Sequence, residues 1–181
     1  MGTGLLTAVI LVVLLFLLKG KNSYRDSLPA HLQALARLDA GLVQEQIPYL
    51  FTESLPPNVS QCGIDFSLPL YAFVDDTDHL GVLLPLSSAS QWEDYLRGMD
   101  IPIEKQRGYR WACHDHWLMV FSDDRCLMHG PLSEQEIVQI RGRMAELMKQ
   151  RPDEEDSLLT HIEKSDAPLS AVFSLRFAKR L

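Results

Sequence analysis

The sequence opens with an apolar run that has no polar face. Between Gly4 and Leu18 the only polar side chain is that of Thr7. A membrane-spanning helix needs about 20 apolar residues, with a lower limit of about 17. Residues 1–18 therefore predict a single transmembrane anchor, and residues 19–29, which are polar and contain Gly and Pro, predict a linker.

The rest of the chain, residues 30–181, carries the patterns of a single domain. Period-two alternation and short apolar runs bounded by turn residues predict strands. These strands cover residues 33–38, 70–74, 79–86, 109–113, 117–121, 125–129 and 169–177. Short turns separate several of them, so we expect one hairpin followed later by an antiparallel meander.

Helical segments lie between these strands. Asp39 is placed to cap a short helix over residues 40–46. Ser-x-x-Glu capping boxes at residues 90–93 and 133–136 begin two longer helices, and residues 158–162 form a short amphipathic segment. Because hairpins dominate, the predicted fold class is α+β, with a mainly antiparallel sheet, helices packed on one face, and one N-terminal transmembrane helix.

Charge and cysteine content exclude some classes of function. The chain has 24 acidic and 17 basic residues, a net charge of −7, and no clustered basic stripe, so we expect no nucleic-acid partner. Cys62, Cys113 and Cys126 are odd in number and widely spaced, unlike a disulfide framework or a zinc motif. The last two lie on next-but-one strands about 10 Å apart, which predicts free thiols.

Aromatic residues concentrate on the predicted sheet. If one face of the sheet is uncovered, these side chains would form a binding surface for a ligand or a partner; otherwise they are core. The candidates are Tyr71, Phe73, Tyr109, Trp111 and Trp117.

Histidines near the meander are the alternative site. His114 and His116 flank the tip of one turn, and His129 lies on a neighbouring strand. A zinc ion takes three or four such ligands, so the three would make a metal centre; as exposed turn residues they would not. The carboxylates of residues 75–78 lack the calcium-loop pattern and predict a hairpin turn. Since no motif for catalysis or for phosphate binding occurs, we expect no enzyme and no cofactor.

The order of several segments resembles a known family. The segments are LPA at 28–30, LARLD at 35–39, GIDFSLPLYAFV at 63–74, GYRWA at 108–112, MHGP at 128–131 and LMKQ at 147–150. Together they resemble an uncharacterised family of membrane-tethered or lipoprotein-like exported proteins of Bacteroidetes, whose members are longer than this chain. The resemblance implies an exported domain, and it implies no activity, cofactor or catalytic residue.

Two questions about the apolar start stay open. A cleaved signal peptide is the alternative to an anchor, although no basic residue precedes the run and no small-x-small cleavage site follows it. Lys19, Lys21 and Arg25 lie after the run, which by the positive-inside rule favours a cytoplasmic domain. The family resemblance favours the exported, periplasmic side of a bacterial envelope, and that is the location we expect.

The predicted function is that of a non-enzymatic, membrane-anchored envelope domain. It would be held at the membrane by residues 1–18 and would bind a protein or another envelope component. The contact would use either the sheet face or the long loop from Thr52 to Ser67. The alternative is a metal-binding protein or metal-dependent enzyme built on His114, His116 and His129.

Overall fold

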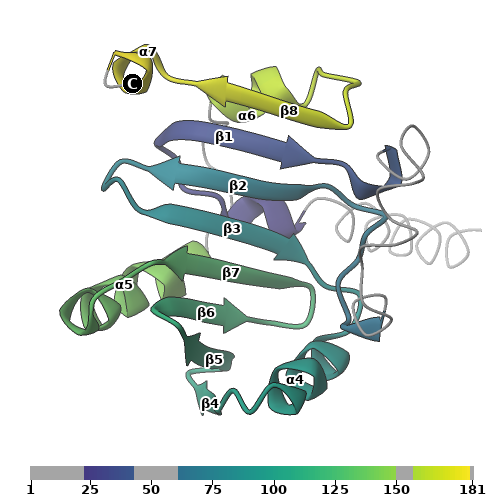
Figure 1. The fold of residues 1–181 in the computed structure, drawn as a ribbon, viewed down its shortest axis with the longest axis vertical. Helices are drawn as coiled ribbons and strands as arrows, with labels where there is room; N and C mark the ends of the chain where they lie inside the picture. The colour runs from purple at the N-terminus through teal and green to yellow at the C-terminus, as the bar shows by residue number, and fades with distance from the viewer. Residues whose placement is uncertain (1–22, 43–60, 150–156, 180–181) are drawn as a thin grey trace, which may run out of the picture.

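An eight-stranded antiparallel sheet organises the molecule (Figure 1). The computed structural model describes residues 23–42, 61–149 and 157–179. The strand order is β4-β5-β6-β7-β3-β2-β1-β8, and every neighbouring pair is antiparallel. The strands are β1 (Leu32–Leu38), β2 (Leu70–Asp75), β3 (Leu80–Pro85), β4 (Ile103–Gln106), β5 (Tyr109–His114), β6 (Trp117–Phe121), β7 (Arg125–Gly130) and β8 (Leu169–Phe173). The predicted α+β class with an antiparallel sheet is confirmed.

The local connections follow the sequence patterns closely. The β2–β3 hairpin and the β5–β6–β7 meander are both present. Strand β4 was not predicted, because its four residues, IEKQ, show no apolar alternation. The last strand is shorter than predicted: the Ser174 side chain accepts from the Phe177 N–H at 3.2 Å and begins the short helix α7 (Leu175–Ala178).

Helices begin at identifiable caps. Helix α5 (Glu134–Leu147) has the predicted capping box, in which Ser133 and Glu136 satisfy each other's backbone N–H groups. The predicted capping box at Ser90 is wrong. The N-cap of helix α4 (Ala89–Gly98) is Ser88, whose side chain accepts from the Gln91 N–H. The remaining helices are η1 (Ser23–Ser27), a 3₁₀ turn, and α6 (Ser157–Ile162).

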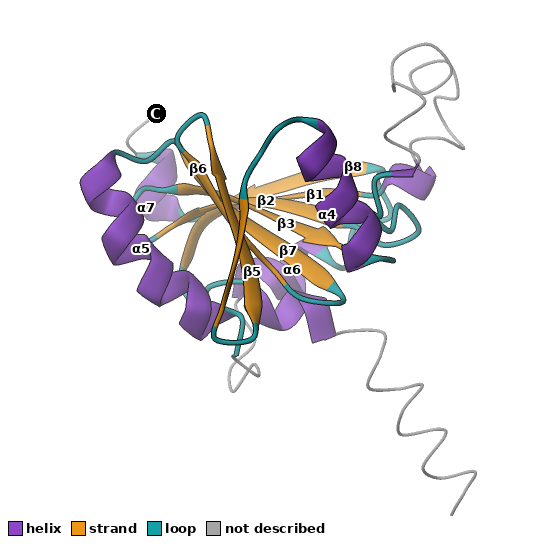
Figure 2. Ribbon diagram, turned by 90° about the horizontal axis from the view of Figure 1, so that it is seen from below, coloured by secondary structure: helices purple, strands orange, loops and turns teal. Residues whose placement is uncertain are grey.

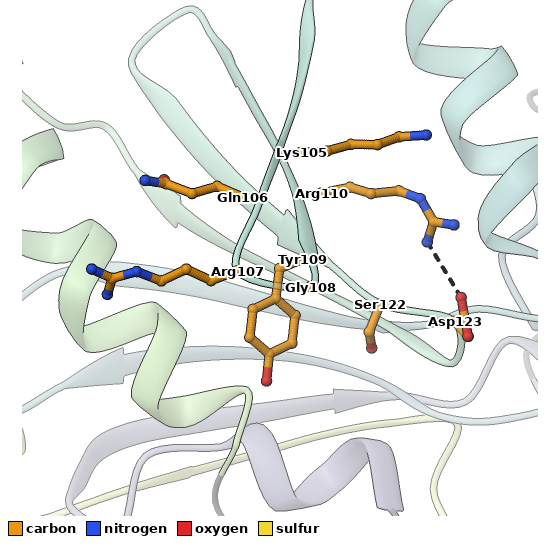
Figure 3. Close-up of a pocket in the computed structure, with 8 residues that line it drawn as sticks. All are labelled: Lys105, Gln106, Arg107, Gly108, Tyr109, Arg110, Ser122 and Asp123. Atoms are coloured by element: carbon orange, nitrogen blue, oxygen red, sulfur yellow. Dashed lines mark hydrogen bonds and ion pairs between the residues drawn. The ribbon is translucent and has the colours of Figure 1, made fainter.

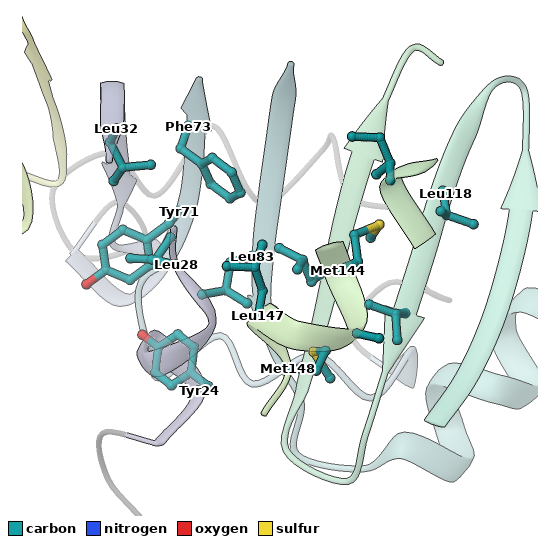
Figure 4. Packing of buried hydrophobic residues seen from close by; sticks show 14 of the residues in the cluster. Tyr24, Leu28, Leu32, Tyr71, Phe73, Leu83, Leu118, Met144, Leu147 and Met148 are labelled. Carbon is teal, nitrogen blue, oxygen red and sulfur yellow. The ribbon is translucent and has the colours of Figure 1, made fainter. Parts of the chain in front are cut away.

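Helices cover both sides of the sheet, so the prediction that they pack on one face is wrong (Figure 2). The larger core lies under η1, α5 and α6, where Met144 and Leu147 of α5 pack near Phe73 and Leu83 (Figure 4). The smaller core lies under α4 on the opposite side. Alternation along β6 shows the division, because Leu118 and Val120 belong to the first core while Met119 and Phe121 belong to the second.

The predicted transmembrane segment, residues 1–18, lies outside the described residues. Among the residues that are described, no helix is both long enough and apolar enough to cross a membrane.

Candidate binding surface

Helix α4 covers one end of the second side of the sheet. Over β8, β1, β2 and part of β3, the described residues leave this side largely open, except that Phe177 of α7 stacks on Phe173 with ring centroids 5.9 Å apart. Residues that pair directly across strands share a face, and one such row runs Ala171–Ala36–Ala72–Val82–Met128. Larger side chains flank this row on both sides. We call the whole set the open apolar face: Ala36, Leu38, Leu70, Ala72, Val74, Leu80, Val82, Trp117, Met128, Leu169, Ala171 and Phe173.

Exposure distinguishes this face from an ordinary core. Leu38 is 36% exposed, Leu80 40%, Phe173 52% and Leu169 64%, while the others are half-buried or exposed. None of these residues is charged. A solvated face of an antiparallel sheet usually carries polar residues, and a contiguous apolar patch on a folded domain marks an interaction site.

Helix α4 leaves this part of the face bare because of how it is anchored. Glu93, which is 7% exposed, forms ion pairs with Arg97 on its own helix, with Arg110 on β5 at 3.1 Å and with Lys105 on β4 at 3.8 Å. Gly63 fixes the other end, since it has a φ of 86° and a Cβ there would lie 2.3 Å from the Ser88 carbonyl. These contacts hold α4 over the β4–β7 end of the sheet.

The aromatic residues proposed from the sequence are mostly elsewhere. Tyr71, Phe73 and Trp111 are buried in the larger core, and Tyr109 packs against it, so they do not form the predicted open surface. Large rings bury more apolar area than any other side chain, which is why the covered face holds them. Only Trp117 lies on the side of the open apolar face, half-buried with its ring against Gly130.

The long loop proposed as a second contact surface falls largely outside the described residues. Of residues 52–67, only 61–67 are described. In this part the Asp65 side chain accepts from the Ser67 N–H at 3.0 Å, a local turn contact.

The three histidines do not converge. His114 is exposed at the end of β5 and lies 3.3 Å from Asp115, while His116 is an exposed turn residue whose Nδ1 lies 3.1 Å from the Leu132 carbonyl. His129 is fully buried on β7, facing the opposite side of the sheet from His114. In the described part of the chain, no group of three His, Cys, Asp or Glu side chains is arranged to hold a metal ion.

The cysteines are free, as expected. Cys113 is exposed, whereas Cys62 and Cys126 are buried. Burial raises the pKa of the Cys126 thiol to about 12, with a weaker opposing contribution from the Trp92 N–H. A thiol held protonated in this way is a packing group rather than a nucleophile.

The carboxylates of the β2–β3 hairpin serve the turn. Asp75 is fully buried, and its Oδ1 accepts from the Thr77 N–H at 2.9 Å, the Thr77 hydroxyl at 2.7 Å and the His79 N–H at 3.1 Å. Its Oδ2 lies 3.6 Å from Arg143 on α5, and the same guanidinium pairs with Asp76. This pairing lowers the pKa of Asp76. The predicted turn is confirmed, and it also ties the hairpin to α5.

His129 is the most perturbed group next to this network. Its ring lies edge-on to the ring of Phe73, with the two centroids 5.4 Å apart. Neither ring nitrogen has a hydrogen-bond partner among the described residues. Burial lowers its pKa to about 4, although the nearby Asp75 carboxylate opposes that shift. The imidazole is therefore neutral at pH 7 and acts as a core side chain.

A polar pocket of about 450 Å³ lies around the β4–β5 turn (Figure 3). Its basic side chains do not converge: Arg107 points to one side of the hairpin, whereas Lys105 and Arg110 point to the other. The latter two pair with Glu93, and Arg110 also lies 3.3 Å from Asp123. The pocket therefore holds the ion pairs that dock α4, and it lacks a convergent cluster of cations for an anion.

Comparisons with known proteins give the fold but not a function. No family model matches the sequence, and no curated protein matches it. Among solved structures, crystal form IV of TP0453, a Treponema lipoprotein, matches with a TM-score of 0.56 at 6% identity, over 81% of this chain and 62% of that chain. Crystal form I matches with a TM-score of 0.50 at 8% identity, over 81% of this chain and 60% of that one. This chain thus shares a fold with TP0453 over about three-fifths of that protein's length.

The strand patterns contained a signal for the open apolar face. In β2 and β3, apolar residues occupy positions of both parities, a pattern that predicts apolar side chains on both faces of the sheet. What the sequence did not reveal is that α4 covers only one end of the second face.

Proposed function

We propose that this chain is a membrane-tethered, non-enzymatic binding module of a bacterial envelope that holds a partner protein on its open apolar face. The observation that carries the proposal is the open apolar face itself, whose uncharged side chains include the exposed Leu38 and Leu80. A partner with a complementary apolar surface, such as one side of an amphipathic helix, would remove this area from water at about 25 cal/mol per Å².

The surroundings of the titratable groups favour binding over catalysis. His129 and Cys126, which have strongly shifted pKa values, are buried in packed cores. The carboxylates of Asp75 and Glu93 are occupied by structural contacts on opposite sides of the sheet. These groups stabilise the scaffold that presents the open apolar face.

The location belongs to the proposal as well. Residues 1–18 would tether the domain, and the domain would face the exported side of the membrane. Protease treatment of intact spheroplasts tests this: we expect digestion of the domain from outside, and protection of the domain would contradict the exported side.

Photo-crosslinking in cells tests the binding surface. The full chain carries a benzophenone amino acid either at Leu80, on the open apolar face, or at Val138, which is 77% exposed on α5 and serves as the control. We expect a discrete adduct with one partner protein from position 80 only. The added change Leu38→Asp, on β1 towards the other end of the same open apolar face, should abolish that adduct. The same adduct from position 138, or an adduct that Leu38→Asp leaves unchanged, would contradict the proposal.

A further inference from the structure

The two ends of the sheet differ in how they are protected against pairing with another strand. Strand β4 is four residues long and carries Glu104 and Lys105, which guard an edge by charge. Strand β8, with the sequence LSAVF, has no charged residue and no Pro. Its side chains are exposed at every second position and half-buried at the others. An uncharged apolar edge of this kind is a template for an added strand.

The β1–β8 ladder shows which backbone groups of β8 point away from β1 and have no neighbouring strand among the described residues. Two hydrogen bonds bracket it: the Ser174 N–H donates to the Gln33 carbonyl at 2.7 Å, and the Asp39 N–H donates to the Pro168 carbonyl at 2.8 Å. Hydrogen-bonded positions recur at every second residue of an antiparallel ladder, so the even-numbered residues of β8 face β1. The backbone N–H and C=O groups that point away from β1 belong to Leu169, Ala171 and Phe173.

These same three residues present their side chains on the open apolar face. Leu169 pairs with Leu38, Ala171 with Ala36, and Phe173 with Ala34. The backbone groups that point away from β1 and the apolar side chains therefore lie together along one edge, and a strand added there would extend the open apolar face.

The pattern of β8 is self-complementary. In an antiparallel pairing centred on Ala171, this residue lies opposite itself, and Leu169 of each copy lies opposite Phe173 of the other. All three positions become hydrogen-bonded pairs, which gives two N–H···O=C bonds between each pair of facing residues. The small alanine side chain sits on the twofold axis, no like charges meet, and each Leu–Phe pair is a favourable cross-strand contact.

We propose that β8 pairs antiparallel with β8 of a second copy of this chain, around a twofold axis at Ala171, so that two sheets and their open apolar faces become continuous. The contact uses the backbone of the sheet edge. It stands whether or not the interior of the open apolar face holds another protein.

Cysteine crosslinking tests both the pairing and its register. The full chain is prepared in mild detergent with Cys113, the exposed thiol, changed to Ala. Across a hydrogen-bonded antiparallel pair the Cα atoms are about 5.5 Å apart, which suits a disulfide. We expect Ala171→Cys to give a covalent dimer on mild oxidation. Ser170→Cys, which would lie opposite Val172 with its side chain on the other face, and Val138→Cys on α5 should remain monomeric.

A charge introduced on strand β8 provides a second test of the pairing. In the protein without added cysteine, Ala171→Lys would place two like charges opposite each other, and we expect the dimer dissociation constant to rise about tenfold or more. Leu80→Asp, on the interior of the open apolar face, should leave the dimer intact even if it abolishes crosslinking to a partner protein. A monomeric parent chain, or equal crosslinking from positions 170 and 171, would overturn the inference, and circular dichroism confirms that each variant is folded.

Discussion

The two faces of this sheet are made by the same strands but differ in how much of each face the helices cover. One face packs Phe73, Leu83 and Met144 into a continuous core under η1, α5 and α6. The other is covered by α4 at one end, and over β8, β1 and β2 the described residues leave it largely bare, apart from Phe177 of α7, which stacks on Phe173. Both faces are apolar, so composition does not distinguish them. What distinguishes them is where the helices return to the sheet.

The covered face also contains two fully buried polar side chains. Asp75 and His129 are both fully buried beside the aromatic core. Asp75 is hydrogen-bonded there, whereas the ring nitrogens of His129 have no hydrogen-bond partner among the described residues. The open apolar face has no such groups. We therefore expect substitutions on the covered face to change stability and substitutions on the open apolar face to change binding. The following experiments test this contrast.

The largest expected effect is a cavity on the covered face. Met144 is fully buried, and Met144→Ala removes side-chain contacts that the surrounding core cannot fully replace. We expect a loss of about 2–5 kcal/mol in the free energy of unfolding, measured by chemical denaturation. Val138→Ala on the exposed side of the same helix is the control, and it should change stability by less than about 0.5 kcal/mol. Equal losses from the two variants would contradict the assigned core.

Lowering the pH should reduce the stability of the protein through a buried group on the covered face. His129 has a folded-state pKa of about 4 against 6.5 for an ordinary histidine, so between these values the unfolded chain binds a proton that the folded chain does not. Stability should therefore fall as the pH is lowered from 6.5 to 4, by roughly 3 kcal/mol from this group.

The variant His129→Leu isolates that contribution. It removes two buried nitrogens that have no hydrogen-bond partner in the described part of the chain, so at pH 7 the variant should be as stable as the parent or more stable. The difference between parent and variant should grow in favour of the variant as the pH falls from 6.5 to 4. Parallel pH profiles for the two proteins would show that His129 is not the group responsible.

Overpacking gives a smaller effect on the same face. A Cβ on Gly81 would lie 2.2 Å from the Phe73 ring, so Gly81→Ala should destabilise the protein by about 1–3 kcal/mol. Gly142 on α5 has no atom within 4 Å of such a Cβ, and Gly142→Ala should instead stabilise its helix by up to about 1 kcal/mol. The thermal unfolding midpoints of the two variants should move in opposite directions.

The smallest effect on stability is expected on the open apolar face. Leu80 is 40% exposed, and Leu80→Gln should alter the free energy of unfolding by no more than about 0.5 kcal/mol while weakening partner binding. Chemical denaturation of the variant checks the first part, and photo-crosslinking from a reporter at Val74, the cross-strand neighbour of Leu80, checks the second. A loss comparable to that of Met144→Ala would mean that this face is covered in the folded protein.

Local elements of the fold could be predicted because their signals lie close together in the sequence. The β2–β3 hairpin follows from the Asp-rich turn at 75–78, and the α5 capping box follows from Ser133 and Glu136. Strand β4 could not be found, because an exposed edge strand needs no apolar alternation. The candidate site was predicted only in outline: a sheet face was expected, but of the five aromatic residues proposed for it only Trp117 lies on the open side, and the other four belong to the larger core or pack against it.

The sequence by itself determined the fold class, the order of most elements and which stretches are apolar, because hydrophobic period and turn chemistry are local properties. Only the tertiary structure decided which apolar residues are covered. That outcome depends on ion pairs between distant segments, such as Glu93 with Arg110, and on Asp75 and Arg143 joining the hairpin to α5. It also depends on β8 taking the outer edge beside β1, which brings Leu169, Ala171 and Phe173 next to Leu38. No local pattern encodes that neighbour, because strand order is chosen by the packing of the whole sheet.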